Sequence, residues 1–374
     1  MADFVSRASL VAPLLSLVLG ACDKGSYQAQ SADGAGGVGS SASGGSTSGG
    51  ATAAPPGKLP VPPGPGDAPA PSGATANLRV LPWAGFASAV SYTFDDSQPS
   101  QIDHFAELAA TGVRMTFYVN PSGKSYAGYV ATWQEAIAQG HEIGNHTVNH
   151  CHADLADCSG ALETLDLEID ECSSYIVSEL GQPSVWTFAY PFGDTGYQAS
   201  ASKRFFLARG VNSGTIAPNG TTNPHNLPVI PAVGGEAASV FNGHIDTASE
   251  QGRWLIFLFH SVLPTAQNWY AGVELASITE SIEHAKALEN VWLDSVVEIG
   301  AYWLGQRSFE ASTPTTEGET ITWTWELPAH FPAGRVLRVA VDGGTLSQGG
   351  ESLAWDGHGY YEVALDAGAL TWTP

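Results

Sequence analysis

The stretch that decides the fold class is Trp254–Phe259 (WLIFLF), an uninterrupted apolar run that His260 follows directly. A strand covered on both faces is apolar at nearly every position, whereas a strand with one wetted face alternates between apolar and polar residues. Val185–Tyr190 (VWTFAY) shows a similar pattern. Both runs therefore predict strands buried inside a parallel α/β sheet or barrel.

Working outward from these runs, short apolar segments alternate with helical patterns from about residue 77 to residue 306. The other expected elements are strand Ala89–Phe94, helix 100–112, strand Met115–Val119, a helix around 132–139 and helix 161–180. This repeated strand–helix alternation predicts a parallel α/β fold. Active sites on such folds gather at the carboxyl ends of the strands.

Polar clusters follow several of the predicted strands. Asp95 and Asp96 end the first strand, and His260 ends the last. His146 and His150 are four residues apart, so on a helical turn both imidazoles face the same way and suit a divalent metal. Each cluster alone has an ordinary alternative, namely an acidic turn or solvated and core histidines.

In this order and spacing the clusters resemble the motifs of the polysaccharide deacetylases, the NodB-homology enzymes of carbohydrate esterase family 4. The motif T-F-D-D is intact at 93–96, H-[ST]-x-x-H at 146–150 and L-x-H at 258–260. The resemblance covers about residues 88 to 300. It implies a distorted (β/α)7-type barrel, in agreement with the alternation of strands and helices.

The resemblance also implies roles for single residues. Asp96, His146 and His150 would bind a divalent metal, with Zn²⁺ as the expected ion. Asp95 would be the general base that takes a proton from the attacking water. His260 would be the general acid that protonates the departing amine or alcohol.

The third family motif is carried by Tyr190-Pro191-Phe192-Gly193. The backbone N–H of Phe192 would help to hold the oxyanion, and Tyr190 and Pro191 are expected to contact substrate. Ala189 stands where the family often has an arginine that braces the base. Arg114, Arg204 or Arg209 could replace it, and the sequence does not choose among them. His141 is expected to be structural rather than a ligand.

The chain begins with features of an exported lipoprotein. Residues 1–21 are expected to be a signal peptide, because Leu10–Leu19 is apolar but shorter than the roughly 20 residues that span a bilayer. The run ends Leu19-Gly20-Ala21-Cys22, like a bacterial lipobox, so Cys22 is expected to carry a lipid anchor. Residues 22–76, rich in Gly, Ser and Pro, are expected to form a disordered tether. The expected location is extracytoplasmic, on a bacterial membrane or cell surface.

Three further cysteines would then share an oxidising compartment. Cys151 follows the second predicted histidine ligand, Cys158 precedes the 161–180 helix and Cys172 lies inside it. Cys158 and Cys172 should lie too far apart to bridge. Either Cys151–Cys158 or Cys151–Cys172 remains open, and either would brace the loop behind the metal ligands.

The pattern changes after the expected deacetylase domain, residues 77–306. Residues 307–374 are expected to form a small all-β, sandwich-like accessory module. Six aromatic residues of this module would either fill its core, as we favour, or stack on sugar rings: Trp323, Trp325, Trp355, Tyr360, Tyr361 and Trp372.

Composition narrows the function classes. The chain of 374 residues holds 14 Lys and Arg against 37 Asp and Glu, a net charge of -23. This charge argues against nucleic-acid binding, which needs a basic face. We expect a metal-dependent hydrolase that removes N-acetyl groups from amino-sugar polymers or O-acetyl groups from a polysaccharide such as xylan. The alternatives are a catalytically silent surface protein that binds glycans on the same fold, and a hydrolase of a non-sugar amide.

Overall fold

The computed structural model describes residues 57–156 and 158–374. The expected signal peptide, the lipidation site Cys22 and residues 22–56 of the expected tether lie outside these described residues. No helix in the described part of the chain is long and apolar enough to cross a membrane.

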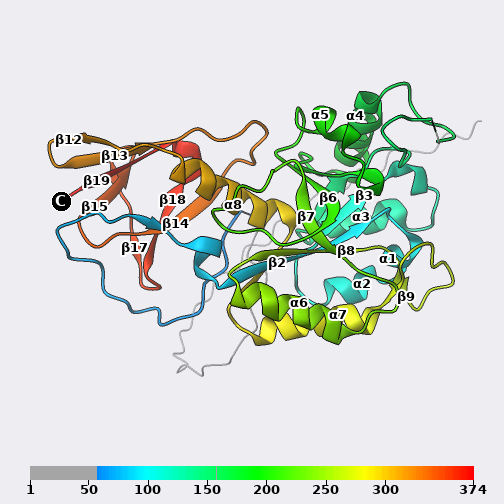
Figure 1. The fold of residues 1–374 in the computed structure, drawn as a ribbon, viewed down its shortest axis with the longest axis horizontal. Coiled ribbons are helices and arrows are strands. Elements are labelled where there is room, and N and C mark those ends of the chain that lie inside the picture. Colours follow the sequence, from blue (N-terminus) through cyan, green and yellow to red (C-terminus); the bar gives the residue numbers. More distant parts are fainter. Residues whose placement is uncertain (1–56, 157) are drawn as a thin grey trace, which may run out of the picture. The chain divides into compact units, whose positions relative to one another are not determined.

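Within the described residues, seven parallel strands close into a barrel (Figure 1). In barrel order they are β2 (Ser88–Asp95), β3 (Thr116–Val119), β4 (Glu142–Asn145), β5 (Thr187–Ala189), β6 (Leu207–Ser213), β7 (Leu227–Pro231) and β8 (Trp254–Phe259). Strand β8 closes the barrel by pairing with β2 from Ala89↔Trp254 to Phe94↔Phe259. Every residue of these two strands is buried, which the continuous apolar run of β8 predicts. The expected (β/α)7-type barrel is thereby confirmed.

The barrel is distorted along one edge of β2. Thr93–Asp95 pair with β3, but Ser88–Val90 pair with an additional parallel strand, β11 (Val291–Leu293). The two partners therefore share one edge of β2.

The helices of the described chain surround the strands. They are α1 (Pro99–Asp103), α2 (Phe105–Ala109), α3 (Tyr129–Ala138), α4 (Leu165–Tyr175), α5 (Gln198–Ala201), α6 (Ala238–Glu250), α7 (Leu275–Ala287) and α8 (Val296–Glu310). Short helical turns are η1 (Pro82–Gly85), η2 (Pro121–Gly123), the π-helical η3 (Ile176–Leu180), η4 (Pro191–Gly193), η5 (Thr195–Tyr197) and η6 (Leu365–Ala367).

Two expected helices differ from the structure. The predicted helix 100–112 is interrupted at His104, whose backbone leaves the helical region. The predicted helix 161–180 begins later, because the Thr164 side chain accepts a hydrogen bond from the Leu167 N–H and caps α4 there.

Helix α8 covers the amino ends of the barrel strands. Its first N–H groups, at Val296 and Val297, donate to Thr116 at the start of β3 and to Glu142 at the start of β4. Further along, Gly300 lies so close to Leu207 that a Cβ atom would meet that side chain. With this end covered, the carboxyl ends of the strands remain as the open mouth of the barrel.

A module of two antiparallel sheets follows the barrel. One sheet has the order β1 (Arg79–Val80), β14 (Val336–Ala340), β18 (Tyr360–Ala364) and β17 (Trp355–Asp356). The other has the order β12 (Thr315–Glu317), β13 (Thr320–Thr324), β19 (Ala369–Thr373), β15 (Thr345–Gln348) and β16 (Glu351–Ser352). Trp325, Trp372, Tyr360 and Tyr361 are buried in the module, as a core-filling role requires.

The module and the barrel do not separate at the expected boundary between residues 306 and 307. Helix α8 runs through that boundary, and Tyr302 and Phe309 on it belong to the same hydrophobic cluster as Leu337 and Val363 of the module. Figure 1 shows α8 between the two groups of strands. A shared core follows from this continuous helix, which packs against both.

Residues 57–76 differ from the expected disordered tether. The buried Arg338 guanidinium donates to the carbonyl oxygens of Pro60 (2.8 Å) and Ala84 (3.0 Å). The N–H of Ala68 donates to the carbonyl of Gly357, 2.8 Å away. This segment is therefore fixed along the module by hydrogen bonds to its backbone, which the local composition cannot predict.

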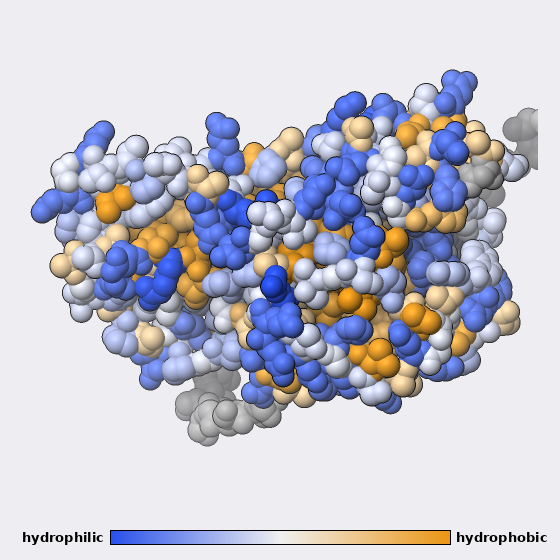
Figure 2. Space-filling model, in the orientation of Figure 1, coloured by the Kyte–Doolittle hydropathy of each residue, from blue (hydrophilic) through white to orange (hydrophobic). Residues whose placement is uncertain are grey.

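The face of the molecule in Figure 2 is largely hydrophilic, with separate hydrophobic patches.

Candidate active site

The polar residues predicted from the sequence lie at the open mouth of the barrel. Asp95 is the last residue of β2 and Asp96 follows it. His146 follows β4 directly, and His260 follows β8 directly. Because the strands are parallel, these chain positions share one end of the barrel.

Three side chains point their ligand atoms at one another. The Nε2 atoms of His146 and His150 each lie 3.3 Å from Oδ1 of Asp96. These atoms all lie within 4.8 Å of one another. Two ligands of a tetrahedral zinc ion with bonds of about 2.1 Å lie about 3.4 Å apart. The spacing therefore fits a single divalent metal held by these three groups.

The hydrogen bonds around the ligands support the same conclusion. Nδ1 of His146 donates to the carbonyl of Ala189 (2.9 Å), so the lone pair of the neutral ring is on Nε2, which faces Asp96. Oδ2 of Asp96 accepts from the buried Gln98 amide (3.1 Å), whereas the buried Oδ1 accepts no hydrogen bond from the described residues. An unsatisfied carboxylate oxygen opposite an imidazole lone pair is costly unless a cation lies between them.

The electrostatics favour the ligand forms of two of these groups. Burial opposes ionisation of Asp96, but the imidazoles of His146, His150 and His260 outweigh it and hold the pKa of this carboxyl well below its usual range. Burial and the neighbouring His146 lower the pKa of His150 to about 4. At neutral pH Asp96 is therefore ionised and His150 is neutral, as metal ligation requires. The pKa of His146 is raised, because Asp95 and Asp96 together outweigh its burial.

Asp95 is held by an arginine from another strand. The guanidinium Nη2 of Arg209, on β6, donates to Oδ1 of Asp95, and both side chains are buried. The other carboxylate oxygen of Asp95 lies 3.7 Å from Nε2 of His146. The guanidinium of Arg209 also lies over the ring of Tyr118, 4.6 Å from its centroid.

Of the three candidate arginines, Arg209 is therefore the one that contacts Asp95. Arg114 pairs with Asp294, at 2.5 Å, and Arg204 pairs with Asp170. Arg209 could have been identified only from the strand register, because it is the in-register partner of Ala189 across β5 and β6. This register could not be read from the sequence.

His260 lies at the edge of the ligand cluster. Its Nε2 is 4.0 Å from Oδ2 of Asp96, and burial lowers its pKa against the opposing influence of Asp95 and Asp96. Its buried Nδ1 has no hydrogen-bond partner among the described residues. The buried Gln101 amide donates to the backbone carbonyls of Asp95 (2.5 Å) and His260 (3.0 Å) and so ties the ends of β2 and β8 together.

The residues of the third motif differ in their exposure. Phe192 is 54% exposed and has a positive φ of 56°, which turns its backbone sharply after β5. Tyr190, expected to contact substrate, is instead 1% exposed, and its hydroxyl donates to the carbonyl of His225. Pro191 is buried as well. Tyr190 follows a short strand whose alternation points it into the aromatic cluster with Phe188, so its side chain cannot reach substrate.

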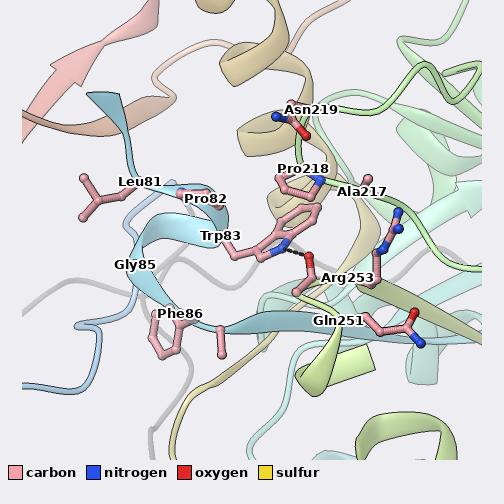
Figure 3. A pocket seen from close by; sticks show the side chains of 12 residues that line it. Leu81, Pro82, Trp83, Gly85, Phe86, Ala217, Pro218, Asn219, Gln251 and Arg253 are labelled. Carbon is pink, nitrogen blue, oxygen red and sulfur yellow. Dashed lines mark hydrogen bonds between the residues drawn. The ribbon is translucent and has the colours of Figure 1, made fainter. Parts of the chain in front are cut away.

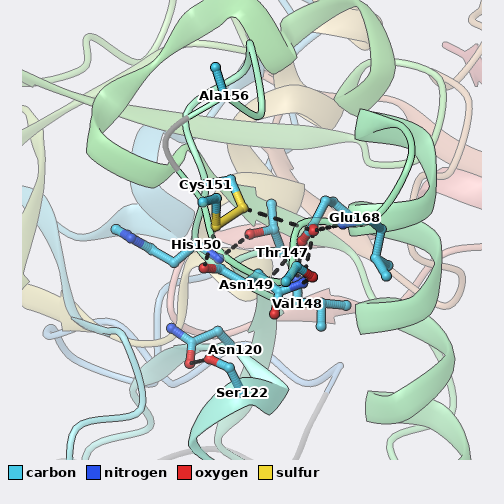
Figure 4. The surroundings of a disulfide bond; sticks show 12 residues. Asn120, Ser122, Thr147, Val148, Asn149, His150, Cys151, Ala156 and Glu168 are labelled. Carbon is cyan, nitrogen blue, oxygen red and sulfur yellow. Dashed lines mark hydrogen bonds between the residues drawn. A yellow bond between two sulfur atoms is a disulfide. The ribbon is translucent and has the colours of Figure 1, made fainter. Parts of the chain in front are cut away.

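The structure shows one of the two disulfide pairings that the sequence left open. Cys151 forms a disulfide with Cys158, seven residues away, directly behind His150 (Figure 4). Cys172 is free and buried in α4. His141 accepts a hydrogen bond from the N–H of Met115 and packs on aromatic rings, which agrees with a structural role.

Aromatic side chains at the mouth were missed by the sequence reasoning. Phe192 stacks on His152, with centroids 4.0 Å apart, and also contacts His150. Tyr270 contacts His260, with centroids 4.8 Å apart, and Tyr270 and Trp269 are 63% and 58% exposed. In barrel order β5 and β8 lie on opposite sides of the mouth, so exposed rings flank the ligand cluster from two sides.

The loop that carries Trp269 and Tyr270 is anchored at both ends. Strands β9 (Val262–Leu263) and β10 (Val273–Glu274) pair with each other on either side of it. The backbone N–H groups of Trp269 and Tyr270 donate to the buried hydroxyl of Ser261. The backbone of this pair is therefore fixed, and the Tyr270 ring lies against His260.

A separate cavity of about 650 Å³ lies at the other end of the barrel (Figure 3). It lies beside Trp83, Pro218 and Arg253, near the starts of β2 and β8, and Trp83 donates to the carbonyl of Gly252. None of the predicted site residues lines it. The candidate site therefore rests on the mouth of the barrel.

Comparison with protein-family models agrees with this geometry. Residues 86–205 match the polysaccharide deacetylase family model, and this segment carries Asp95, Asp96, His146 and His150. The match assigns this segment, about a third of the chain, to the family and confirms the family and the hydrolase class expected from the sequence. Arg209 and His260 lie beyond the matched segment.

Similar proteins are distant. A gellan lyase from Bacillus sp is 29% identical over 138 residues, which make up 36% of this chain and only 5% of that protein. A putative polysaccharide deacetylase from Mycobacterium smegmatis is 15% identical at a TM-score of 0.45, covering 64% of this chain and 95% of its own. The polysaccharide deacetylase Bc1974 from Bacillus cereus is 14% identical at a TM-score of 0.37, covering 56% and 91%.

Proposed function

We propose that this deacetylase is a divalent-metal-dependent enzyme that removes acetyl groups from a polysaccharide. The bond is either the N-acetyl amide of an amino-sugar polymer or the O-acetyl ester of a polysaccharide such as xylan. One observation carries the proposal: the Asp96, His146 and His150 ligand atoms converge beside a second carboxylate, Asp95, and a histidine, His260.

Asp96, His146 and His150 would hold the metal, and we propose zinc. A bound divalent metal polarises the acetyl carbonyl and lowers the pKa of water to about 7. Asp95, oriented by Arg209, accepts the proton of the attacking water. His260 donates a proton to the departing nitrogen or oxygen, so that the sugar leaves as a neutral amine or alcohol. The backbone N–H of Phe192 stabilises the negative oxygen that develops on the carbonyl.

The exposed rings support a glycan as the substrate. Aromatic faces stack on the apolar faces of sugar rings, and Phe192, Trp269 and Tyr270 offer such surface on both sides of the ligand cluster. A polysaccharide that crosses the mouth could contact both sides while its acetyl group lies over the ligands.

We further propose that the enzyme is extracytoplasmic and attached to a bacterial membrane through a lipid on Cys22. The sequence supports this through the apolar run that ends in Leu19-Gly20-Ala21-Cys22. The Cys151–Cys158 disulfide is consistent with an oxidising compartment.

Two sequence features favour the catalytically silent, glycan-binding alternative: Ala189, at the position of the family arginine, and the aromatic β module on a tethered chain. Arg209 braces Asp95 from the adjacent strand, so Ala189 no longer favours that alternative. Both proton-transfer residues lie next to the ligand cluster.

The test is acetate release by the full chain from N-acetyl chitooligosaccharides and from acetylated xylan, measured in parallel with zinc added after chelation. The control is Asp95→Asn, which is expected to retain zinc and lose turnover by about 10²–10⁴-fold. Release from one of the two substrates that this change abolishes would identify the bond cleaved. Zinc-loaded enzyme that releases acetate from neither substrate would contradict the proposal.

A further inference from the structure

A buried carboxylate lies behind the loop that presents His150. Glu168, on α4, is 0% exposed, and its oxygens accept hydrogen bonds from N–H donors (Figure 4). Oε2 accepts from the backbone N–H groups of Asn149 (2.9 Å) and Val148 (3.1 Å), and the Val148 N–H is shared with the main-chain carbonyl of Glu168 (3.1 Å). Oε1 accepts from the backbone N–H of Leu162 (2.8 Å) and from the Asn149 side-chain amide (2.9 Å). One carboxylate therefore holds two successive backbone N–H groups between the predicted ligands.

The loop that Glu168 holds has a strained backbone. Thr147 has a φ of 63° and His150 a φ of 53°, in the left-handed region that residues other than glycine rarely adopt. Such a conformation is strained and persists only where the surroundings fix it. Val148 and Asn149 are the two residues between these strained positions. Their bonds to Glu168 thus act on the segment whose conformation most needs support.

The two histidine ligands depend on this loop to different degrees. His146 is fixed independently by its bond to the Ala189 carbonyl, and its side chain is 2% exposed. His150 is 24% exposed, and its backbone N–H is held by Thr147, which is itself part of the loop. A shift of the loop would therefore move Nε2 of His150 away from Asp96 while leaving His146 in place.

We propose that Glu168 is a positioning residue for metal binding, whose carboxylate fixes the 147–150 loop so that His150 completes the site with Asp96 and His146. The inference rests on the proposed metal site. Glu168 touches neither the ligand atoms nor the substrate, and it acts only through the backbone of the loop.

Glu168→Gln tests this role because the change is nearly isosteric. The four hydrogen bonds to the carboxylate all come from N–H donors, so the amide nitrogen of glutamine must face donors with a donor. Sγ of Cys151 also lies 4.0 Å from Oε1, but in the disulfide it has no proton to donate. Glu171→Gln is the matched control, since Glu171 is an exposed carboxylate on the same helix. The two variants change charge equally.

The experiment measures zinc affinity of the metal-free full chain by competition with a chromophoric chelator, and the absorption spectrum of the Co²⁺-substituted protein. We expect Glu168→Gln to weaken zinc binding by roughly 10–100-fold and to change the Co²⁺ spectrum, as loss of an outer support of a ligand does. Glu171→Gln is expected to match the wild type. At saturating zinc the KM of Glu168→Gln for an acetylated oligosaccharide should stay within about twofold of the wild-type value, because the substrate surface is untouched.

Wild-type zinc affinity and an unchanged Co²⁺ spectrum in Glu168→Gln would overturn the inference. A wild-type chain that binds no zinc would instead overturn the proposed metal site, so the two failures are distinguishable. If Glu168→Gln does not fold, Asn149→Ala removes one of the four bonds and is expected to weaken zinc binding severalfold. Unchanged affinity in that folded variant would equally overturn the inference.

Discussion

Arg209 forms a buried ion pair with Asp95 from the strand next to the one on which the deacetylase motif often has its arginine. Ala189 on β5 and Arg209 on β6 are in-register partners, so their side chains leave the sheet on the same face. A guanidinium from either position can then approach the end of β2. The ion pair with Asp95, the proposed general base, is retained although the motif arginine is not.

Removing the guanidinium of Arg209 should strongly reduce both stability and activity. Arg209→Ala leaves the carboxylate of Asp95 buried without its cation, and loss of one partner of a buried pair costs about 3–5 kcal/mol. We expect the free energy of unfolding to fall by that amount and acetate release to be almost abolished. Urea denaturation and the acetate assay measure the two effects. Wild-type turnover in Arg209→Ala would show that Asp95 needs no brace.

A relocated arginine should restore part of the loss. The double variant Ala189→Arg/Arg209→Ala returns a guanidinium to the position typical of the family motif. We expect roughly tenfold more activity than in Arg209→Ala, in line with couplings of about 1–2 kcal/mol between contacting residues. The comparison is kcat/KM of the single and double variants. Equal values would mean that the two positions are not interchangeable.

Glu142 should make stability depend on pH. This carboxyl is buried at the start of β4, and burial raises its pKa to about 7 although Thr187, Val297 and Thr116 donate hydrogen bonds to it. The folded chain thus binds this proton more tightly than the unfolded chain, where the pKa is near 4.5. Its contribution is fully present below about pH 4.5 and is lost as pH rises through about 7.

The measurement is urea denaturation of the wild type and Glu142→Gln at pH 5, 6, 7 and 8. Relative to the glutamine variant, the wild type should lose up to about 1.4 kcal/mol per pH unit between pH 5 and 7, and little above that range. Parallel stability curves for the two proteins would contradict the raised pKa of Glu142.

The Cys151–Cys158 disulfide should stabilise both the fold and the 147–150 loop. A closed loop of this length is worth about 2.5 kcal/mol from chain entropy. We expect Cys151→Ser/Cys158→Ser to lower Tm and also to weaken zinc binding, because Cys151 follows His150 in the chain. Calorimetry and zinc competition check both. A lower Tm with unchanged zinc affinity would limit the disulfide to a stabilising role.

The aromatic residues beside His260 should affect polymer binding more than chemistry. Trp269→Ala removes an exposed ring and is expected to raise KM for an acetylated oligosaccharide by about 3–10-fold, since such ring contacts contribute about 0.5–1.5 kcal/mol. Hydrolysis of a small aryl acetate, which cannot reach the ring, serves as the control and should stay unchanged. An equal loss on both substrates would argue against a role in glycan binding.

Much of the fold could be predicted because its cause is local. Continuous apolar runs such as Trp254–Phe259 require a strand buried on both faces, and their alternation with helices predicts a parallel α/β sheet or barrel. The family resemblance then implied the barrel. The pairing of β11 with one half of β2, and the hold of Arg338 on residues 57–76, depend on contacts between residues far apart in sequence. No local pattern encodes such contacts.

The same distinction applies to the site. Asp96 and His146 directly follow strands and His150 lies four residues further along, so their approach follows from the fold and from the family motif. Arg209 needs the register of β5 against β6, and Glu168 resembles the exposed carboxylates around it on α4. Tyr190 was expected to contact substrate and points inward instead, because one step along a strand reverses the face of a side chain.

The central claim is that one metal, held by Asp96, His146 and His150, is required for deacetylation. The direct test titrates the metal-free full chain with zinc while bound zinc and acetate release are measured on the same samples. The account predicts that activity rises with bound zinc and stops rising at one zinc per chain, and that His150→Ala abolishes both. Acetate release without bound metal, or tight zinc binding that survives the loss of His150, would contradict it.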